Sequence, residues 1–169
     1  MELLLIRHAV AEEREDWAAT GKDDSLRPLT KSGRLKMQRG ARALRRVVPL
    51  LDVIATSPYT RAAETAKIVA AAYDDVAVER LDALVPEGRP QDFLAWLRTR
   101  GAGERVAAVG HEPHLGALVY WLLTGKAVTE RIAMKKGGAC LLSLDPRSRS
   151  GRATLLWSLT PSIMRRLDA

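Results

Sequence analysis

Short aliphatic runs alternate with helix-like segments along most of the chain, and this alternation constrains the fold more than any other feature. Four of the runs have the length of buried strands, and each is followed by a longer segment with helical spacing. Such alternation is typical of a layered α/β domain with a largely parallel sheet. We predict strands at 2–6, 52–56, 76–80 and 105–109, helices at 30–48, 58–73, 91–100 and 113–124, and a terminal hairpin at 139–145 and 153–159.

Length and composition fit a single domain that spans residues 1–169. Hydrophobic residues make up 47% of the chain, yet no apolar run reaches the roughly 20 residues that span a bilayer, so no membrane partner is expected. No cationic segment precedes the first apolar run, so we expect no signal peptide. Cys140 is the only cysteine, which excludes an internal disulfide and a cysteine-rich zinc site. The cytoplasm is therefore the expected location.

The net charge of +7 favours anionic partners, among them phosphates, nucleic acids and acidic proteins. The chain has no nucleic-acid-binding motif, and its few aromatic residues lie mainly in core-like positions, so nucleic acid is not expected. Three arginines, Arg39, Arg42 and Arg46, share one face of the predicted helix at 30–48. That face is either solvated or a docking surface for an acidic protein. These patterns leave the oligomeric state open.

Polar side chains stand at the ends of three predicted strands. Arg7 and His8 follow the first strand, and His111 follows the fourth. Ser57 follows the second strand and leads to Arg61 in the first turn of the next helix. Ligands of open α/β sheets bind at the carboxyl ends of the strands. We therefore expect these side chains to lie close together at one edge of the sheet.

The residue types at this edge fit a phosphate site. Arginines offer forked, permanently charged donors that match phosphate oxygens, and helix N-termini add unpaired backbone N–H groups. The two histidines add nucleophilic groups that titrate near neutrality. One histidine can attack phosphorus while the other donates hydrogen bonds to the phosphoryl oxygens, whose charge must be stabilised during transfer.

The motifs around these residues resemble those of the histidine phosphatase superfamily, which includes the phosphoglycerate mutases. They occur in the same order and extend over nearly the whole chain. Within the superfamily the chain is most similar to the SixA-type phosphohistidine phosphatases, because it has no room for the additional helical insertions of the mutases. The resemblance rests on Arg7-His8-Ala9 after Leu5-Ile6, Arg27-Pro28-Leu29-Thr30 with Gly33, Ser57-Pro58-Tyr59-Thr60-Arg61-Ala62 with Glu64-Thr65-Ala66, and Gly110-His111-Glu112-Pro113.

This resemblance implies a phosphoglycerate mutase-like fold, which is a three-layer α/β/α sandwich with a mostly parallel central sheet and a C-terminal hairpin. It also implies that His8 is the transiently phosphorylated nucleophile and that Arg7, Arg61 and His111 complete the phosphate pocket. Glu87 lies in the region where many members carry a general acid, although SixA-type proteins often lack a clear one. Because a phosphohistidine leaving group departs as imidazole, it needs an acid less than an alkyl phosphate does. No metal or organic cofactor is implied.

Each of these residues also has a structural interpretation. His8 and His111 can be ordinary residues at a strand end and a helix start. Arg61 can be a surface arginine that pairs with Glu64 one turn away. Ser57 is expected to cap the helix that follows it, with a phosphate contact as the alternative.

Residues 11–28 are polar and aperiodic, and we predict that they form a long loop. Arg27, near the end of this segment, is either solvated or shares in substrate binding. His114 lies three residues after His111 and could form a metal site with it and His8. No carboxylate lies at a recognised ligand spacing and the arginines would repel a cation, so no metal is expected.

We expect a phosphatase that works through a phosphohistidine enzyme intermediate and removes phosphate from phosphohistidine in a protein. One alternative is a broad-specificity phosphomonoesterase that acts on small molecules or on other protein phosphoesters. Another is a non-catalytic module that binds anions or phosphoproteins, which the charge of +7 favours. Substrate profiling separates the first two, and anion binding without turnover would indicate the third.

Overall fold

The computed structural model describes residues 1–127, 132–147 and 149–168, and its framework is a six-stranded sheet. Its strands are β1 (Glu2–Arg7), β2 (Val53–Thr56), β3 (Val78–Arg80), β4 (Arg105–Gly110), β5 (Ala139–Ser143) and β6 (Thr154–Leu159). They lie side by side in the order β3-β2-β4-β1-β5-β6. The first four strands are parallel, and β5 and β6 form an antiparallel hairpin along β1. The prediction of a mostly parallel sheet with a C-terminal hairpin is confirmed.

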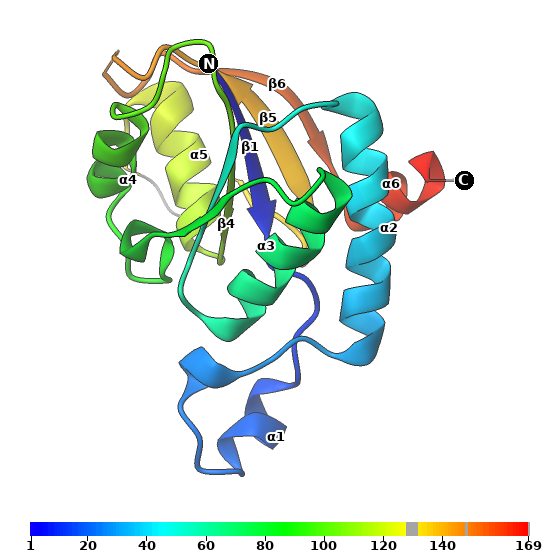
Figure 1. The fold of residues 1–169 in the computed structure, drawn as a ribbon. Helices are drawn as coiled ribbons and strands as arrows, with labels where there is room; N and C mark the ends of the chain where they lie inside the picture. The colour runs from blue at the N-terminus through cyan, green and yellow to red at the C-terminus, as the bar shows by residue number, and fades with distance from the viewer. Residues whose placement is uncertain (128–131, 148, 169) are drawn as a thin grey trace.

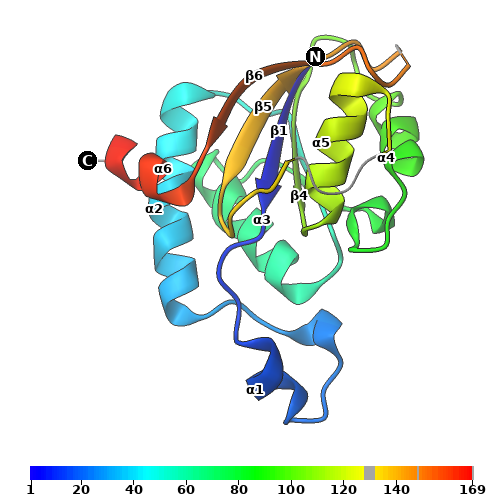
Figure 2. The same ribbon diagram turned by 180° about the vertical axis from the view of Figure 1, so that it is seen from behind.

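Helices cover both faces of this sheet, which confirms the three-layer α/β/α arrangement (Figures 1 and 2). They are α1 (Arg14–Ala18), η1 (Asp24–Leu26), α2 (Lys31–Val47), α3 (Thr60–Ala72), η2 (Asp82–Leu84), α4 (Pro90–Leu97), α5 (His114–Thr124) and α6 (Pro161–Leu167). One face of the sheet packs against α2, α3 and α6, and the other packs against α4 and α5. None of the helices in the described part of the chain is long and apolar enough to cross a bilayer.

The four inner residues of β1 are aliphatic because helices bury both faces of this strand. Leu4 and Ile6 belong to the core under α2, α3 and α6, whereas Leu3 and Leu5 belong to the core under α4 and α5. All four side chains are fully buried. This packing fixes β1 inside the sheet and brings the residues that follow it to the carboxyl edge.

α2 begins where the sequence predicts. The Thr30 hydroxyl accepts a hydrogen bond of 2.9 Å from the N–H of Gly33 and caps the helix. Met37, Ala41 and Leu44 are buried at helical spacing, so the predicted apolar stripe is the face that packs on the sheet.

The arginine face of α2 is partly covered by α6, a helix that the sequence patterns did not predict. Arg39 and Arg42 lie 3.5 and 2.7 Å from the Asp168 carboxylate, and Arg46 donates a hydrogen bond to the Leu167 carbonyl. The face is therefore only in part the solvated surface that we expected. α6 was missed because its 7 residues are too few to show a helical period, although Thr160 caps it in the usual way.

The segment between β1 and α2 was predicted to be a loop, and this is wrong in part because it contains α1 and η1. The Asp23 carboxylate accepts a hydrogen bond of 2.8 Å from the N–H of Ser25 and so caps η1. The indole N–H of Trp17 donates to the Asp23 carbonyl at 3.0 Å. Local hydrogen bonds of this kind leave no hydrophobic period in the sequence. The segment lies beyond the carboxyl end of β1 (Figure 1).

α3 begins at Thr60 with Tyr59 as its N-cap residue, so the prediction that Ser57 caps this helix is wrong. The Ser57 hydroxyl instead accepts a long hydrogen bond of 3.3 Å from the N–H of Tyr59. It also contacts His111, which belongs to a different strand end.

Candidate active site

Three adjacent strands end at the candidate site. β4 lies between β1 and β2, so His111 emerges between His8 and Ser57. Backbone hydrogen bonds continue past the strands. The N–H of His8 donates to the Gly110 carbonyl, and the N–H of Ser57 donates to the Val109 carbonyl, both at 3.0 Å. Backbone hydrogen bonds and the sheet register alone therefore fix the positions of these residues relative to one another.

These strand ends border a cavity of about 330 Å³. Its lining includes five residues predicted from the sequence, namely Arg7, His8, Arg27, Arg61 and His111. The structure thus brings together residues that lie up to about a hundred positions apart in the chain. A cavity of this size, with arginines and histidines converging on it, has the dimensions and charge for a phosphoryl group and part of its substituent.

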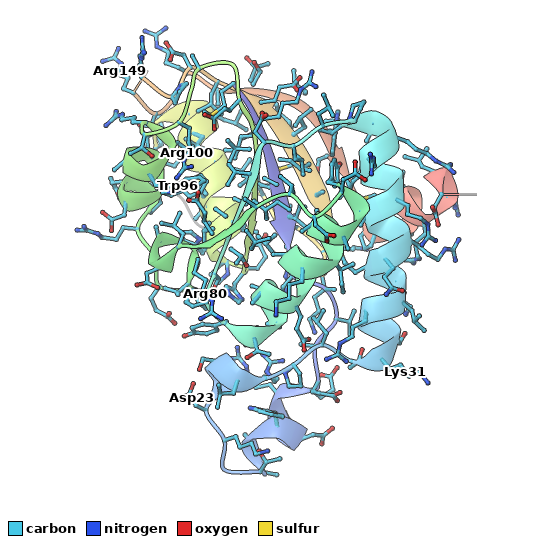
Figure 3. All side chains as sticks on the ribbon, viewed as in Figure 1. Asp23, Lys31, Arg80, Trp96, Arg100 and Arg149 are labelled. Carbon is cyan, nitrogen blue, oxygen red and sulfur yellow. The ribbon has the colours of Figure 1, made fainter. Side chains whose placement is uncertain are left out.

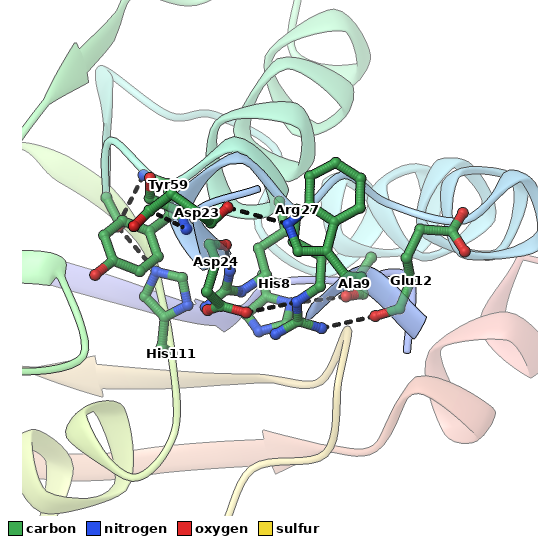
Figure 4. Close-up of polar contacts among 12 residues, drawn as sticks. His8, Ala9, Glu12, Asp23, Asp24, Arg27, Tyr59 and His111 are labelled. Atoms are coloured by element: carbon green, nitrogen blue, oxygen red, sulfur yellow. Dashed lines mark hydrogen bonds and ion pairs between the residues drawn. The ribbon is translucent and has the colours of Figure 1, made fainter. Parts of the chain in front are cut away.

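His8 is held in one tautomer by its own neighbour. Its Nδ1 lies 2.7 Å from the Ala9 carbonyl, which can only accept, so Nδ1 carries the proton and Nε2 carries the lone pair (Figure 4). Burial lowers the pKa of His8 to about 3, and the positive charges of Arg61, Arg7 and Arg27 act in the same direction. At neutral pH the ring is therefore uncharged, as a nucleophile requires.

The second histidine faces the first. The ring centroids of His8 and His111 are 5.1 Å apart, and Nε2 of His111 lies 2.9 Å from the Ser57 hydroxyl. Nδ1 of His111 is buried without a hydrogen-bond partner, on the side of the ring toward His8 (Figure 4). Burial lowers the pKa of His111 to about 2, assisted by His8 and Arg61. An anion that reached Nδ1 from the adjoining cavity would give it the partner that it lacks.

Arg61 is a pocket residue rather than a surface residue. It is only 2% exposed. Its guanidinium group donates to the backbone carbonyl of Asp24 at 2.8 Å and lies 3.0 Å from the Asp24 carboxylate. The alternative in which Arg61 pairs with Glu64 is wrong, because Glu64 pairs with Arg34 at 2.8 Å. Burial lowers the pKa of Arg61, with Asp24 opposing the shift, and an arginine remains protonated in such a site.

Asp24 bridges two arginines of the cavity. Its carboxylate lies 2.8 Å from Nε of Arg27 and 3.0 Å from Nη2 of Arg61 (Figure 4). Burial raises the pKa of Asp24, but the hydrogen bond from Arg27 and the charges of both arginines outweigh this and lower it overall. Asp24 is thus ionised, and it orients both guanidinium groups toward the site. Asp24 lies in the segment that was predicted to be a loop, and only the conformation of this segment brings it to Arg61, 37 positions away.

A loop contact positions Arg7. Nη1 of Arg7 donates to the Met134 carbonyl at 2.7 Å, and the Met134 N–H donates to the Glu112 carboxylate at 2.8 Å. Burial lowers the pKa of Arg7, and the negative charge of Glu112 opposes this shift. Glu112 therefore acts on Arg7 in two ways. It holds the backbone of Met134, which orients Arg7, and its negative charge partly compensates the positive charge of Arg7. Glu112 belongs to the Gly110-His111-Glu112-Pro113 motif, but no role for it follows from the sequence alone.

Further residues of the site were not predicted. Arg14, Lys136 and Glu13 line the same cavity. Arg14 and Glu13 come from the segment that was expected to be a loop, and Lys136 precedes the Gly137 N–H that donates to the backbone of Arg7 and His8. The general excess of basic residues was the only signal for Arg14 and Lys136 in the sequence, and Glu13 had none.

Glu87, the candidate general acid, lines an adjoining hollow rather than the cavity that contains His8. This hollow, of about 630 Å³, lies between Trp17 and Tyr59, and it meets the His8 cavity at Arg14 and Pro86. The hollow leaves room for a leaving group beside the phosphate cavity.

His114 lies one turn after His111 and is buried, with neither ring nitrogen hydrogen-bonded. Burial lowers its pKa, and the charge of Glu87 opposes the shift. Among the described residues, the histidine, cysteine, aspartate and glutamate side chains form no cluster of three that could hold a metal ion.

The sequence and structural similarities of this chain identify its family. The model of the histidine phosphatase superfamily (branch 1) matches residues 3–85, which include Arg7, His8 and Arg61. An uncharacterized protein of Picosynechococcus sp. is 34% identical over 140 residues, which is 82% of each chain. The chain belongs to the histidine phosphatase superfamily.

Solved structures place it more narrowly. The structure of the protein histidine phosphatase SixA complexed with tungstate matches with a TM-score of 0.78 and 25% identity, over 96% of this chain and 98% of that one. A putative alpha-ribazole-5'-P phosphatase from Escherichia coli K-12 matches with a TM-score of 0.76 and 20% identity, over 96% and 98%. The structure is SixA-like and has the phosphoglycerate mutase-like fold, whereas the named substrates of these neighbours differ.

Proposed function

We propose that this protein is a phosphatase in which His8 forms a phosphohistidine intermediate. The observation that carries the proposal is the hydrogen bond from His8 Nδ1 to the Ala9 carbonyl, at 2.7 Å. This bond leaves the Nε2 lone pair free in a neutral ring, inside a cavity that Arg7, Arg27 and Arg61 make strongly positive. A nucleophile and a set of phosphate ligands are thus present in one place.

The reaction proceeds in two displacements at phosphorus. In the first, Nε2 of His8 bonds to phosphorus while the bond to the leaving group breaks and its electron pair departs with that group. Arg7, Arg61 and Nδ1 of His111 stabilise the charge on the equatorial oxygens. In the second, water attacks phosphorus, the bond to Nε2 breaks, and inorganic phosphate and free His8 result. A covalent intermediate divides one difficult step into two easier ones.

We further propose that the substrate is phosphohistidine in a protein. An imidazole leaves without the strong acid that an alkoxide needs, and Glu87 lies outside the His8 cavity. Both carboxylate oxygens of Glu112 accept backbone N–H groups, from Met134 and Gly116, which restrains that group as a proton donor. The net charge of +7 suits a phosphorylated protein as partner. In this proposal the whole chain, residues 1–169, acts as one cytoplasmic domain.

Trapping of the intermediate tests this function. The protein is mixed with a ³²P-labelled phosphohistidine peptide and quenched in alkali within milliseconds, because a phosphoramidate is stable to base and labile to acid. We expect label on His8, at Nε2 by ³¹P NMR, and no label or turnover in His8→Ala. His114→Ala is the matched control, since this buried histidine lies outside the cavity lining. Turnover that survives in His8→Ala would refute the mechanism.

A broad phosphomonoesterase remains the second candidate, because the hollow beside the His8 cavity has room for a small-molecule leaving group. Comparison of kcat/KM for a phosphohistidine peptide, phosphoserine and an alkyl phosphate discriminates between the two. A clear preference for the peptide supports the first proposal, and equal values support the second. Phosphate binding without any turnover would indicate a non-catalytic binding module instead.

A further inference from the structure

A second cavity, of about 190 Å³, lies behind the backbone that follows His8. Ala9 and Val10 form one wall, and Met37 and Gly40 of α2 and Met164 of α6 form another. The lining is largely apolar, unlike that of the phosphate cavity. An apolar cavity of roughly 150 Å³ holds a benzene ring, so this one has room for a ring with a small substituent.

Three basic side chains also line this cavity: Lys36, Lys136 and Arg165. None of them forms an ion pair with an acidic side chain in the part of the chain that the structure describes, and no aspartate or glutamate is among the described lining residues. The contrast within α2 is sharp, because Arg34, Arg39, Arg42 and Arg45 each pair with a carboxylate. Positive charge is therefore concentrated, without compensation, at an apolar cavity.

We propose that this cavity binds a small aromatic carboxylate. The ring would lie among Met37, Gly40 and Met164, and the carboxylate would pair with Lys36, Lys136 and Arg165. The apolar lining favours burial of the ring by the hydrophobic effect, and the uncompensated cations favour an anionic group over a neutral one.

The site is coupled to the phosphate cavity through one side chain. Lys136 lines both cavities. A carboxylate that binds Lys136 from the apolar side reduces the positive charge available to phosphate on the other side. Occupancy of the second site therefore weakens phosphate binding.

Methionine methyl groups report on the site directly. The chain has 4 methionines, and of these Met37 and Met164 line the apolar cavity. The Met134 side chain is buried in the core under α4 and α5, and Met1 packs against that core, so neither methyl group lines the apolar cavity. In protein labelled with ¹³C at methionine methyls, benzoate should shift the Met37 and Met164 signals saturably and leave Met1 and Met134 in place. Met37 and Met164 signals that do not respond to benzoate would overturn the proposal.

Three comparisons sharpen the test. Benzyl alcohol, the neutral counterpart, should bind severalfold more weakly, and equal affinity would contradict the role of the cations. Lys36→Gln should weaken benzoate binding severalfold, whereas Lys31→Gln should not, because Lys31 points away from the molecule at the start of the same helix (Figure 3). If both variants bind like the wild type, the proposal fails.

Gly40→Leu tests the cavity itself. A Cβ at Gly40 would lie 3.6 Å from the Met164 methyl carbon, an ordinary contact, and leucine favours a helix more than glycine does. The larger side chain fills the cavity, so the benzoate-induced shifts should disappear, and circular dichroism checks folding. If this variant does not fold, the Lys36→Gln and Arg165→Gln pair decides the question. Retained benzoate affinity in folded Gly40→Leu would overturn the proposal.

Coupling is measured with inorganic phosphate, independently of catalysis. Saturating benzoate should raise the apparent Kd for phosphate in the wild type and leave it unchanged in Gly40→Leu, whose phosphate cavity is intact. A phosphate Kd that ignores benzoate in the wild type would refute the coupling through Lys136.

Discussion

The hydroxyl of Ser57 and Nε2 of His111 lie 2.9 Å apart, and this contact joins the ends of two neighbouring strands at the second histidine of the site. Ser57 Oγ accepts the N–H of Tyr59, and its own proton can be donated to Nε2. In the tautomer with that direction, the ring proton of His111 is on Nδ1, the nitrogen on the side of His8 (Figure 4). A helix cap expected from the sequence thus acts in the structure as the partner of a pocket residue.

Replacing Ser57 by alanine removes this partner. A buried polar group left unpaired costs roughly 1–3 kcal/mol, and we expect kcat/KM to fall roughly 10- to 100-fold. ¹⁵N NMR of the imidazole should show a mixture of His111 tautomers in the variant and one tautomer in the wild type. A single unchanged tautomer together with full activity would contradict this role, and a thermal melt controls for loss of fold.

Replacing Asp24 by asparagine should strengthen phosphate binding. The Asp24 carboxylate pairs with Arg27 and Arg61, and it repels an incoming anion. Because the Asp24 side chain is 41% exposed, solvent screens its charge, so its loss should change the free energy of phosphate binding by about 1 kcal/mol and lower the Kd for phosphate severalfold. Calorimetric titration with phosphate measures the change. Asp23→Asn is the matched control, because Asp23 caps η1 without touching either arginine. Weaker binding in Asp24→Asn would show that orientation of the arginines outweighs the repulsion.

The buried histidines predict an acid-sensitive fold. Burial lowers the pKa of His8 to about 3 and that of His111 to about 2, from about 6.5 in the unfolded chain. Below pH 6.5 the unfolded chain therefore binds protons that the folded chain does not. The free energy of unfolding is therefore unaffected by these histidines above pH 6.5. It declines as the pH falls from 6.5 toward their folded-state pKa values, by about 1.4 kcal/mol per pH unit for each histidine.

Urea unfolding at pH 7.5, 6.5 and 5.5 measures this decline in the free energy of unfolding. In His8→Asn the free energy of unfolding should fall less steeply with pH below pH 6.5, by the contribution of one histidine. A free energy of unfolding that is constant over this range would mean that the buried rings acquire protons in the folded state.

Glu87→Gln tests the assignment of the general acid. Because an alkoxide needs a proton more than an imidazole does, the substitution should reduce kcat/KM for an alkyl phosphate more than for a phosphohistidine peptide. Asp92→Gln is a suitable control, since its carboxylate pairs with Arg89 on the surface. An equal loss for both substrates would remove Glu87 from consideration as the acid.

The elements that the sequence predicted are those whose cause is local. One helix contains both the cap at Thr30 and the apolar stripe of Met37, Ala41 and Leu44. The aliphatic run of β1 predicts that both faces of this strand are buried. The shared location of His8 and His111 followed from one general rule about strand ends in α/β sheets.

Contacts made by loops could not be predicted in the same way. Asp24 meets Arg61 over 37 positions, and Glu112 meets Met134 over 22, through backbone that has no period. Asp168 likewise reaches Arg42 only because α6 folds back on α2. Such pairs depend on the path by which the loops bring distant parts of the chain together, and the spacing of residues along the sequence does not predict this path.

The position of β4 between β1 and β2 has a consequence for protein synthesis. β4 follows both of its neighbours in the chain, and it supplies the Gly110 and Val109 carbonyls to which the N–H groups of His8 and Ser57 donate. A nascent chain that ends before Arg105 therefore contains Arg7, His8 and Arg61 but has no strand to hold them around a phosphoryl group. On the ribosome, the proposed nucleophile His8 is translated early and takes its place in the cavity only when the last of the parallel strands is inserted.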